Sequence, residues 1–244
     1  MNVTGKTAVI TGASRGLGAG LAREFYAGGM NVALCARTDP ALADDGERAL
    51  SMRADVTDPD AMASLCERAV ERFGAIDLWL NNAGVLGPIG MLRDLDPAEV
   101  RTHMDVNVLG VMNGTRAYVR HLRGAGRGGV LMNISSGAAR TGYAGWSAYC
   151  ASKAAVDLLT EAVSIEEADA GLRAYAVAPG VIDTDMQTLI RSQRAEDFPS
   201  VERFRQMKRD EAFSTTEHVA RELLRLAFGN DQASEVRVDL RPGR

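Results

Sequence analysis

The stretch TGASRGLG, from Thr11 to Gly18, decides how the chain begins to fold. A short apolar, β-rich run at 7–10 precedes it, and Leu21 and Phe25 follow at helical spacing. This order predicts a strand, a tight turn and a helix that ends at the glycine pair 28–29. Three glycines in one turn indicate that the backbone bends sharply there or lies close to another group.

Gly12, Gly16 and Gly18 can serve two purposes at this turn. They can simply allow the bend, or they can let the backbone approach a pyrophosphate, to which the following helix presents its first N–H groups. A strand before the glycines and a helix after them is the context that a dinucleotide-binding turn requires. We therefore expect a dinucleotide cofactor and keep the ordinary turn as the alternative.

The rest of the chain alternates between strand-like and helix-like segments. The strand-like segments are nearly continuous apolar runs at 31–36, 49–56, 76–84, 128–136, 172–180 and 235–240. Helices are indicated from the cap Asp58 to Gly74, from Asp96 towards Arg123, and over 149–167. This alternation predicts an α/β fold with a mostly or fully parallel sheet and helices on both faces.

Composition limits the kinds of partner. The 244 residues are 46% hydrophobic and 25% charged, with a formal net charge of -4. Because Lys and Arg form no dense cluster, we expect a small-molecule partner and neither a nucleic acid nor a membrane. The absence of a leader-like start or a long apolar run favours the cytoplasm.

The cysteines and histidines give no sign of a metal site. Cys35, Cys66 and Cys150 form neither a CxxC pair nor a Cys/His cluster, and the three histidines are scattered. We expect reduced, buried thiols and no metal.

The end of the second predicted strand bears on the choice of dinucleotide. An acidic residue there would select the free ribose hydroxyl of NAD(H), but the strand ends in Cys35, Ala36 and Arg37. Arg15 lies inside the glycine turn, and two guanidinium groups suit a 2'-phosphate. The pattern favours NADP(H) over NAD(H), and two solvated surface arginines remain the alternative.

Five motifs in order identify a resemblance. Besides Thr11–Gly18 the chain carries NNAG at 81–84, NISS at 133–136, YCASK at 149–153 and PG at 179–180. In this order and spacing the sequence resembles the short-chain dehydrogenase/reductase family. The resemblance implies a single Rossmann-type, doubly wound domain over 1–244, with a substrate lid around 185–212.

The resemblance implies four catalytic residues. Ser136 lies thirteen residues before Tyr149, the interval usual in the family, and Lys153 follows Tyr149 by four positions on the same helix face. Tyr149 would exchange a proton with the substrate, Ser136 would hold the carbonyl oxygen, and Lys153 would bind the ribose and favour the phenolate. Asn107, in DVNVLG, would order a water that returns protons to Tyr149.

The resemblance also implies cofactor contacts along the chain. Asp55 would accept a hydrogen bond from the adenine amino group, Asn81 would open a turn beside the cofactor, and Thr184 would meet the carboxamide. For Asp55 and Asn81, ordinary turn or cap duty is the alternative. The full expected set is Gly12, Ser14, Arg15, Gly16, Leu17, Gly18, Arg37, Asp55, Val56, Asn82, Ala83, Gly84, Tyr149, Lys153, Pro179, Gly180, Ile182 and Thr184.

The second half of the chain resembles one branch of the family. GWSAYCASKAAVD at 145–157 and PGVIDTDMQTLIR at 179–191 look like the sepiapterin and benzil reductases, which reduce one carbonyl beside another carbonyl or imine-like carbon. This resemblance implies an α-dicarbonyl substrate. Asp239 falls roughly where sepiapterin reductase anchors its pterin through a carboxylate.

Candidate substrate residues follow from that branch. Trp146 would form a flat wall, and further contacts are expected from Leu86, Val181, Met186, Gln187 and Ile190. For Trp146 and Met186, packing in the core or between subunits is the alternative. Other open alternatives are a different substrate, such as a steroid, a sugar, a 3-oxoacyl group or a polyketide intermediate, and a non-catalytic NADPH-binding regulator. The resemblance also implies a homodimer or homotetramer paired through the helices after Asn107 and around Tyr149.

Overall fold

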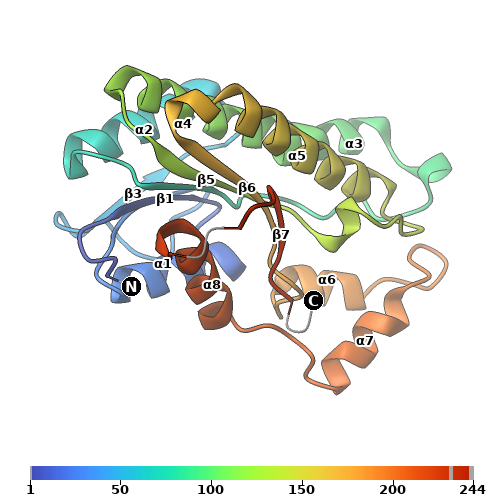
Figure 1. Ribbon diagram of the computed structural model, residues 1–244. Coiled ribbons are helices and arrows are strands. Elements are labelled where there is room, and N and C mark those ends of the chain that lie inside the picture. The colour runs from blue at the N-terminus through green and yellow to red at the C-terminus, as the bar shows by residue number, and fades with distance from the viewer. Residues whose placement is uncertain (1, 231–232, 242–244) are drawn as a thin grey trace.

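The computed structural model describes residues 2–230 and 233–241 of the chain. Its strands are β1 (Thr7–Thr11), β2 (Asn31–Ala36), β3 (Ala49–Arg53), β4 (Leu78–Asn81), β5 (Gly129–Ile134), β6 (Leu172–Ala178) and β7 (Arg237–Asp239). Its helices are α1 (Gly16–Ala27), α2 (Pro59–Phe73), α3 (Pro97–Met104), α4 (Gly110–Ala125), α5 (Ser147–Glu166), α6 (Asp185–Arg191), α7 (Val201–Arg209) and α8 (Thr216–Phe228). Strand and helix alternate as the sequence predicts (Figure 1).

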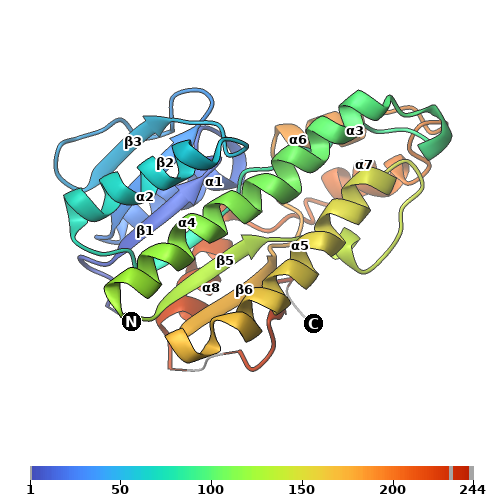
Figure 2. The same ribbon diagram turned by 90° about the horizontal axis from the view of Figure 1, so that it is seen from above.

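All seven strands form one parallel sheet in the order β3-β2-β1-β4-β5-β6-β7. Helices α2, α4 and α5 cover one face, and α1 and α8 cover the other (Figures 1 and 2). The predicted fold class, a doubly wound sheet of Rossmann type, is confirmed. Helices α6 and α7 stand beyond the carboxyl ends of the strands, next to the loops that follow β4 and β5 (Figure 1).

Side chains from alternate positions of each strand fill two separate cores. Ile10 of β1 packs with Phe25 of α1 and Leu223 of α8 on one face. Its neighbour Val9 packs with Leu65 of α2 on the other face. A strand buried on both faces needs apolar residues at every position, which is why these strands appear in the sequence as unbroken apolar runs.

Most predicted elements are one to five residues shorter or longer in the structure, and two of these differences bear on the site. The strand expected over 49–56 ends at Arg53, because Asp55 begins a turn in which its carboxylate accepts hydrogen bonds from Thr57 N and Oγ1, both at 2.9 Å. The helix expected from Asp96 towards Arg123 contains a π-helical turn, Asp105–Leu109, between α3 and α4. π turns are frequent at functional sites.

Asn81 lies inside the fold and not beside the cavity, so its expected role as a cofactor neighbour is wrong. Its Oδ1 accepts a hydrogen bond from Trp79 Nε1 at 2.8 Å. Its Nδ2 donates to Asn133 Oδ1 at 2.8 Å, to Thr115 Oγ1 at 3.1 Å and to Val111 O at 3.3 Å. The buried Asn81 amide connects β4 to β5 and α4 through these hydrogen bonds.

This network should be a main source of stability. We expect Asn81→Leu to lower the free energy of unfolding by about 3 kcal/mol, because it leaves buried groups of Trp79 and Asn133 without partners. Thr115→Val removes one longer bond and should cost about 1 kcal/mol. Urea denaturation of both variants measures the difference, and equal losses would show that the amide network contributes no more than a single hydroxyl.

Candidate functional site

A cavity of about 800 Å³ opens at the carboxyl ends of the strands. It lies where the strand order reverses, between β1 and β4, which is where ligands bind in open α/β sheets. Every residue of the predicted cofactor set lines it: Gly12, Ser14, Arg15, Gly16, Leu17, Gly18, Arg37, Asp55, Val56, Asn82, Ala83, Gly84, Tyr149, Lys153, Pro179, Gly180, Ile182 and Thr184. The structure therefore brings together residues that are up to 172 positions apart in the sequence, from Gly12 to Thr184.

The glycine turn packs directly against the turn after β4. Gly12 has φ +68°, and a Cβ on it would lie 2.7 Å from Ala83 Cα. A Cβ on Gly18 would overlap the side chain of Asn82. Thr11 Oγ1 accepts hydrogen bonds from the N–H groups of Asn82 and Ala83, at 3.0 and 3.1 Å, while Asn82 Nδ2 donates to Thr11 O at 2.9 Å.

The N-terminus of α1 faces this cavity without a side-chain cap. Arg15 occupies the cap position but accepts no hydrogen bond from the first turn, which also holds no acidic residue. In α2, by contrast, Asp58 caps the helix and Asp60 lies in its first turn. Free N–H groups and an unopposed helix dipole, beside glycines where no Cβ fits, match what a pyrophosphate needs. The residues present thus fit a dinucleotide.

Both predicted arginines line the cavity near the adjacent ends of β1 and β2, where the sequence predicts the adenosine half of the cofactor. Arg37 and Arg15 line it, and Arg15 Nη1 is 3.5 Å from Asp185 Oδ2, with both side chains mostly exposed. Asp55 lines the same end while its Oδ1 serves the turn to Thr57. Asp55 therefore both stabilises the turn and lines the cavity. Its contact with adenine stays a prediction.

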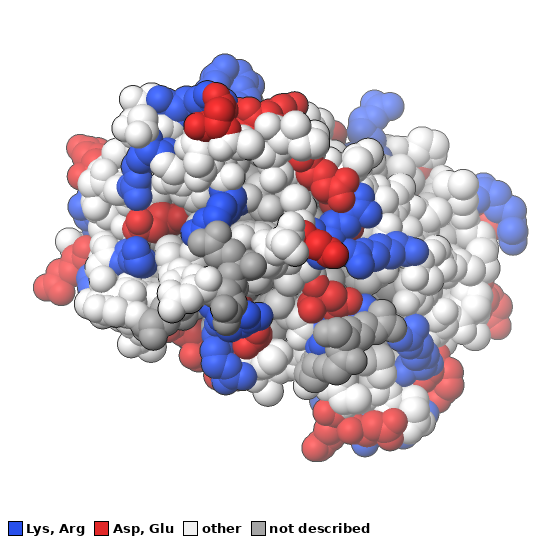
Figure 3. Space-filling model, viewed as in Figure 1, with Lys and Arg blue, Asp and Glu red and all other residues white. Residues whose placement is uncertain are grey.

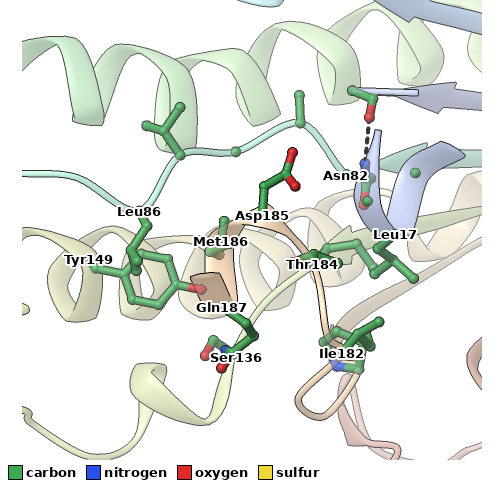
Figure 4. A pocket seen from close by; sticks show the side chains of 18 of the residues that line it. Leu17, Asn82, Leu86, Ser136, Tyr149, Ile182, Thr184, Asp185, Met186 and Gln187 are labelled. Carbon is green, nitrogen blue, oxygen red and sulfur yellow. Dashed lines mark hydrogen bonds between the residues drawn. The ribbon is translucent and has the colours of Figure 1, made fainter. Parts of the chain in front are cut away.

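Ser136, Tyr149 and Lys153 meet at the other end of the cavity. Ser136 follows β5 and its hydroxyl accepts a hydrogen bond from Ala138 N at 3.2 Å, and it lies close enough to the Tyr149 phenol to lower its pKa. Lys153 lies one turn beyond Tyr149 on α5 and donates from Nζ to Ile134 O at 2.8 Å. In Figure 4 Ser136, Tyr149, Met186 and Gln187 gather at one side, while Leu17, Asn82, Ile182 and Thr184 lie at the other.

Burial controls the protonation of this group. Tyr149 is 8% and Lys153 6% exposed. Burial raises the pKa of Tyr149 above its usual value, against the hydrogen bond with Ser136, which lowers it. Burial also lowers the pKa of Lys153 from 10.5 to about 8. The sequence analysis expects the Lys153 ammonium to lower the pKa of Tyr149. In the chain without cofactor, burial outweighs this effect, and the pKa of Tyr149 is raised.

Aromatic side chains form the wall beside Tyr149. The Trp146 ring stacks on Phe198 at 4.4 Å between centroids and meets Tyr149 edge-on at 5.4 Å. Trp146 is thus part of a local core that includes Leu86 and Ile190, and it lines the cavity as well. The predicted positions Leu86, Trp146, Val181, Met186, Gln187 and Ile190 all line the cavity.

Gln187 is the buried polar group of this wall. It is 7% exposed, and its Oε1 has no hydrogen-bond partner within the described part of the chain. A buried amide oxygen without a partner is costly unless a bound molecule satisfies it. Asp239, in contrast, lines an adjoining hollow, where its carboxylate is already held by Arg241.

Comparison with known proteins decides the family. The family model described as "short chain dehydrogenase" matches residues 6–195. The chain belongs to the short-chain dehydrogenases. It is 36% identical over 192 residues to 3beta-hydroxysteroid dehydrogenase 1 of Eggerthella lenta, which covers 75% of this chain and 73% of that one. It is 38% identical over 187 residues to cis-4-hydroxycyclohexanecarboxylate dehydrogenase of Sinomonas cyclohexanicum, covering 74% and 75%.

Solved structures agree with this assignment. The crystal structure of the KRED1-Pglu enzyme superimposes with a TM-score of 0.86 at 33% identity, covering 96% of this chain and 99% of that one. This short-chain dehydrogenase is therefore an oxidoreductase that acts on hydroxyl or carbonyl groups of small molecules with a nicotinamide cofactor, NAD(P)(H). Within residues 2–230 and 233–241, no helix combines the length and the apolar character needed to cross a membrane.

In this dehydrogenase the side chain of Asn107 lies behind the cavity wall. Its Oδ1 accepts from Val85 N and its Nδ2 donates to Val85 O, both at 2.8 Å. Its Nδ2 also lies 3.0 Å from His103 Nε2. The side-chain amide is thus already hydrogen-bonded within the protein, whereas the sequence-based expectation gives Asn107 a water to order. That role stays a prediction.

His103 and Ser152, which do not line the cavity but support Asn107 and Tyr149 from behind, were missed by the sequence reasoning. His103 Nδ1 lies 2.6 Å from Gly87 O, and since a carbonyl only accepts, Nδ1 carries the proton. Nε2 therefore accepts from Asn107 and lies 2.8 Å from Ser152 Oγ. Burial lowers the pKa of His103, which agrees with a neutral ring. The signal was available, because His103 precedes Asn107 by four positions and Ser152 directly precedes Lys153.

The buried ammonium should cost stability. Since a pKa difference of one is worth about 1.4 kcal/mol, holding Lys153 charged in the folded chain at pH 7 costs on the order of 3 kcal/mol. Lys153→Met loses the bond to Ile134 but removes this cost, so we expect the cofactor-free variant to be about 2 kcal/mol more stable than wild type at pH 7.

The pH dependence of that gain gives the sharper test. Between pH 8 and 10.5 the folded chain loses the Lys153 proton before the unfolded chain does, so wild-type stability rises and the advantage of Lys153→Met shrinks. Urea denaturation at pH 7 and pH 9.5 measures this change. Lys208→Met, at an exposed lysine of α7, should show no such trend, and a pH-independent advantage for Lys153→Met would contradict the assignment.

Proposed function

We propose that this short-chain dehydrogenase uses NADPH to reduce a ketone, and that the ketone is an α-dicarbonyl compound. The observation that carries the reduction is the buried group of Ser136, Tyr149 and Lys153 beside a cavity that ends at an uncapped helix N-terminus. A phenol and a hydroxyl that face the same space can hold and protonate one carbonyl oxygen. When bound, the nicotinamide supplies the hydride.

Each side chain has a separate task in this proposal. Ser136 donates a hydrogen bond to the substrate oxygen and fixes its position. Tyr149 donates the phenolic proton to the same oxygen as negative charge develops there, and the raised pKa of the buried phenol keeps that proton in place until then. Lys153 holds the ribose and lies close enough to Tyr149 to stabilise the phenolate once the proton has left.

Preference for NADPH is supported by the charges at the adenosine end. Arg15 and Arg37 line the cavity there, and the described end of β2 carries no acidic residue. A planar guanidinium binds phosphate oxygens through two hydrogen bonds, each strengthened by charge.

The preference is testable at Arg37. We expect Arg37→Ser to lower kcat/KM for NADPH about 10-fold, the typical effect of losing a charge-assisted hydrogen bond, and to leave NADH within about twofold. Arg53→Ser, at an exposed arginine of the neighbouring strand that does not line the cavity, serves as control. An unchanged NADPH to NADH ratio in Arg37→Ser would remove this basis for NADPH preference.

An α-dicarbonyl substrate is supported by the wall beside Tyr149. Trp146 offers a flat apolar surface, and the Gln187 amide, which also lines the cavity, can donate a hydrogen bond from Nε2 to a second carbonyl oxygen. Met186 lines the same wall. We further infer that residues 185–212, which include α6 and α7, close over this end as a lid, because Met186, Ile190 and Phe204 from this segment line the cavity.

A second candidate function follows from the relatives. Their names refer to a 3β-hydroxysteroid and to cis-4-hydroxycyclohexanecarboxylate, so a ring alcohol or ring ketone is the competing substrate class. An NADPH-binding regulator without turnover is a further alternative. A regulator that only binds NADPH would not need a proton donor, so this alternative does not explain the buried group of Ser136, Tyr149 and Lys153.

A substrate panel tests the assignment. We expect turnover of benzil, 1-phenyl-1,2-propanedione and diacetyl, followed as NADPH oxidation, with sepiapterin and a steroid ketone as comparisons. Tyr149→Phe should bind NADPH normally but lose turnover about 100-fold to 10,000-fold. Gln187→Met should lower kcat/KM for 1-phenyl-1,2-propanedione about 10-fold more than for the monoketone propiophenone, because only the diketone offers a second carbonyl.

The outcomes separate the alternatives. Turnover of steroid or ring ketones without turnover of diketones would replace the substrate class and keep the reduction. Tight NADPH binding by wild type with no turnover of any ketone would favour the regulator. Activity in Tyr149→Phe equal to wild type would remove the proposed proton donor.

We also propose a homodimer or homotetramer formed through α4 and α5. Leu109, Met112, Leu158 and Ile165 are 48%, 44%, 63% and 79% exposed on this face, more large apolar surface than a solvated helix pair needs.

A further inference from the structure

A second hollow, of about 230 Å³, adjoins the catalytic end of the main cavity. The two spaces adjoin, because both are lined by Ser136, Gly137, Tyr143, Arg203 and Arg241. A substrate whose ketone lies at Ser136 can therefore extend into the second hollow. This hollow is lined largely by polar and charged side chains, unlike the aromatic wall at Trp146.

Among the charged side chains that line this hollow, guanidinium groups outnumber carboxylates. Arg140, Arg203 and Arg241 line it together with Asp157 and Asp239. Both carboxylates are already engaged, because Asp239 is held by Arg241, and Asp157 accepts a hydrogen bond from the Ser135 hydroxyl and lies 3.8 Å from Arg237 Nε. The charge left over is positive.

Arg203 supplies one of the remaining donors. It extends from α7, and its Nη1 lies 3.3 Å from the Tyr143 hydroxyl. Within the described parts of the chain, Arg203 has no carboxylate partner, in contrast to Arg191, Arg205 and Arg209 on the same lid segment. An arginine that lines a cavity without a counter-ion can bind an anion at little cost of rearrangement.

Arg241 supplies the other donor and lies closest to the reacting group. A Cβ built on Gly137 would be 3.8 Å from Nη2, 3.9 Å from Cζ and 3.9 Å from Nη1, so the guanidinium lies face-on above Gly137, next to Ser136. Asp239 binds Nε and Nη2, which fixes the plane. Among residues 2–230 and 233–241, Nη1 has no hydrogen-bond partner, and Arg241 lines both spaces.

We propose that the ketone substrate carries a carboxylate, and that Arg203 and Arg241 bind it while Ser136 and Tyr149 hold the ketone oxygen. The inference rests on the proposed carbonyl reduction at that site and narrows its substrate class. The carboxylate takes no part in the reaction, in which the ketone gains hydride at carbon and a proton at oxygen. Its role is to fix the substrate on the cationic side of the active site.

Matched pairs of acid and methyl ester test this inference by turnover. The pairs are phenylglyoxylate and 3-benzoylpropionate, each against its own methyl ester, so that two distances between ketone and carboxylate are sampled. We expect kcat/KM to be at least about 10-fold higher for the better acid than for its ester, and the difference to fall as salt is added. No advantage for either acid would overturn the proposal.

Variants identify the residues responsible. Arg203→Gln and Arg241→Gln should each lower kcat/KM for the acid about 10-fold and leave the ester within about twofold. Arg209→Gln, at an exposed arginine of α7 that lines neither space, should change neither. An acid preference that survives in both Arg203→Gln and Arg241→Gln would overturn the assignment of these two side chains.

A binding measurement covers the case in which none of these ketones is reduced. Calorimetric titration of 3-phenylpropanoate and of 3-phenylpropanamide into the enzyme saturated with NADP⁺ compares the same ligand with and without its charge. Tighter binding of the acid, lost in Arg203→Gln, supports the proposal without turnover, and equal binding overturns it.

The same set separates this inference from the proposed α-dicarbonyl reduction. Reduction of the keto acids without reduction of benzil or diacetyl keeps the anionic substrate and removes the neutral diketone. Reduction of diketones with no preference for acids does the opposite.

Discussion

The exchange of hydrogen bonds between Thr11 and Asn82 holds the site together. The two residues stand at the carboxyl ends of β1 and β4, and their side chains bind each other's main chain. This contact requires the two turns to approach so closely that neither Gly12 nor Gly18 has room for a Cβ. The uncapped N-terminus of α1 is aimed into the cavity as a result, and the catalytic end is built from the next two strands along, β5 and β6.

The same burial that shapes the catalytic end also sets its protonation. Burial favours the neutral form of both the Tyr149 phenol and the Lys153 ammonium. Tyr149 therefore keeps its proton to a higher pH, whereas Lys153 loses its proton at a lower pH. For a proton donor this is the useful state. The arrangement lowers the stability of the empty protein in exchange for a site that is ready to protonate an oxygen, a compromise common at functional sites.

The sequence predicted those parts of the protein that depend on local pattern. The alternation of elements, the caps at Asp58 and Asp96 and the glycine turn each follow from short-range rules, and the structure has all of them. The role of Asn81 was misjudged, because adjacent residues of a strand point to opposite faces, and only Asn82 reaches the cavity. The π turn and the engagement of Asn107 with Val85 and His103 depend on tertiary contacts that no local pattern records.

The two ends of the cavity also differ in how the chain encodes them. The cofactor end is built largely from main chain and from glycines, so a motif in the sequence is enough to locate it. The cationic end depends on Arg140, Arg203 and Arg241, which are 63 and then 38 positions apart in the sequence, so only the folded chain shows that they meet. Asp239 shows the consequence. As a lone carboxylate, Asp239 would favour a cationic or guanidine-like ligand. Because Arg241 is bound to it, the hollow instead favours an anionic ligand. The residue type at one position therefore does not indicate the charge of the ligand. The net charge of all the side chains that line the hollow indicates it.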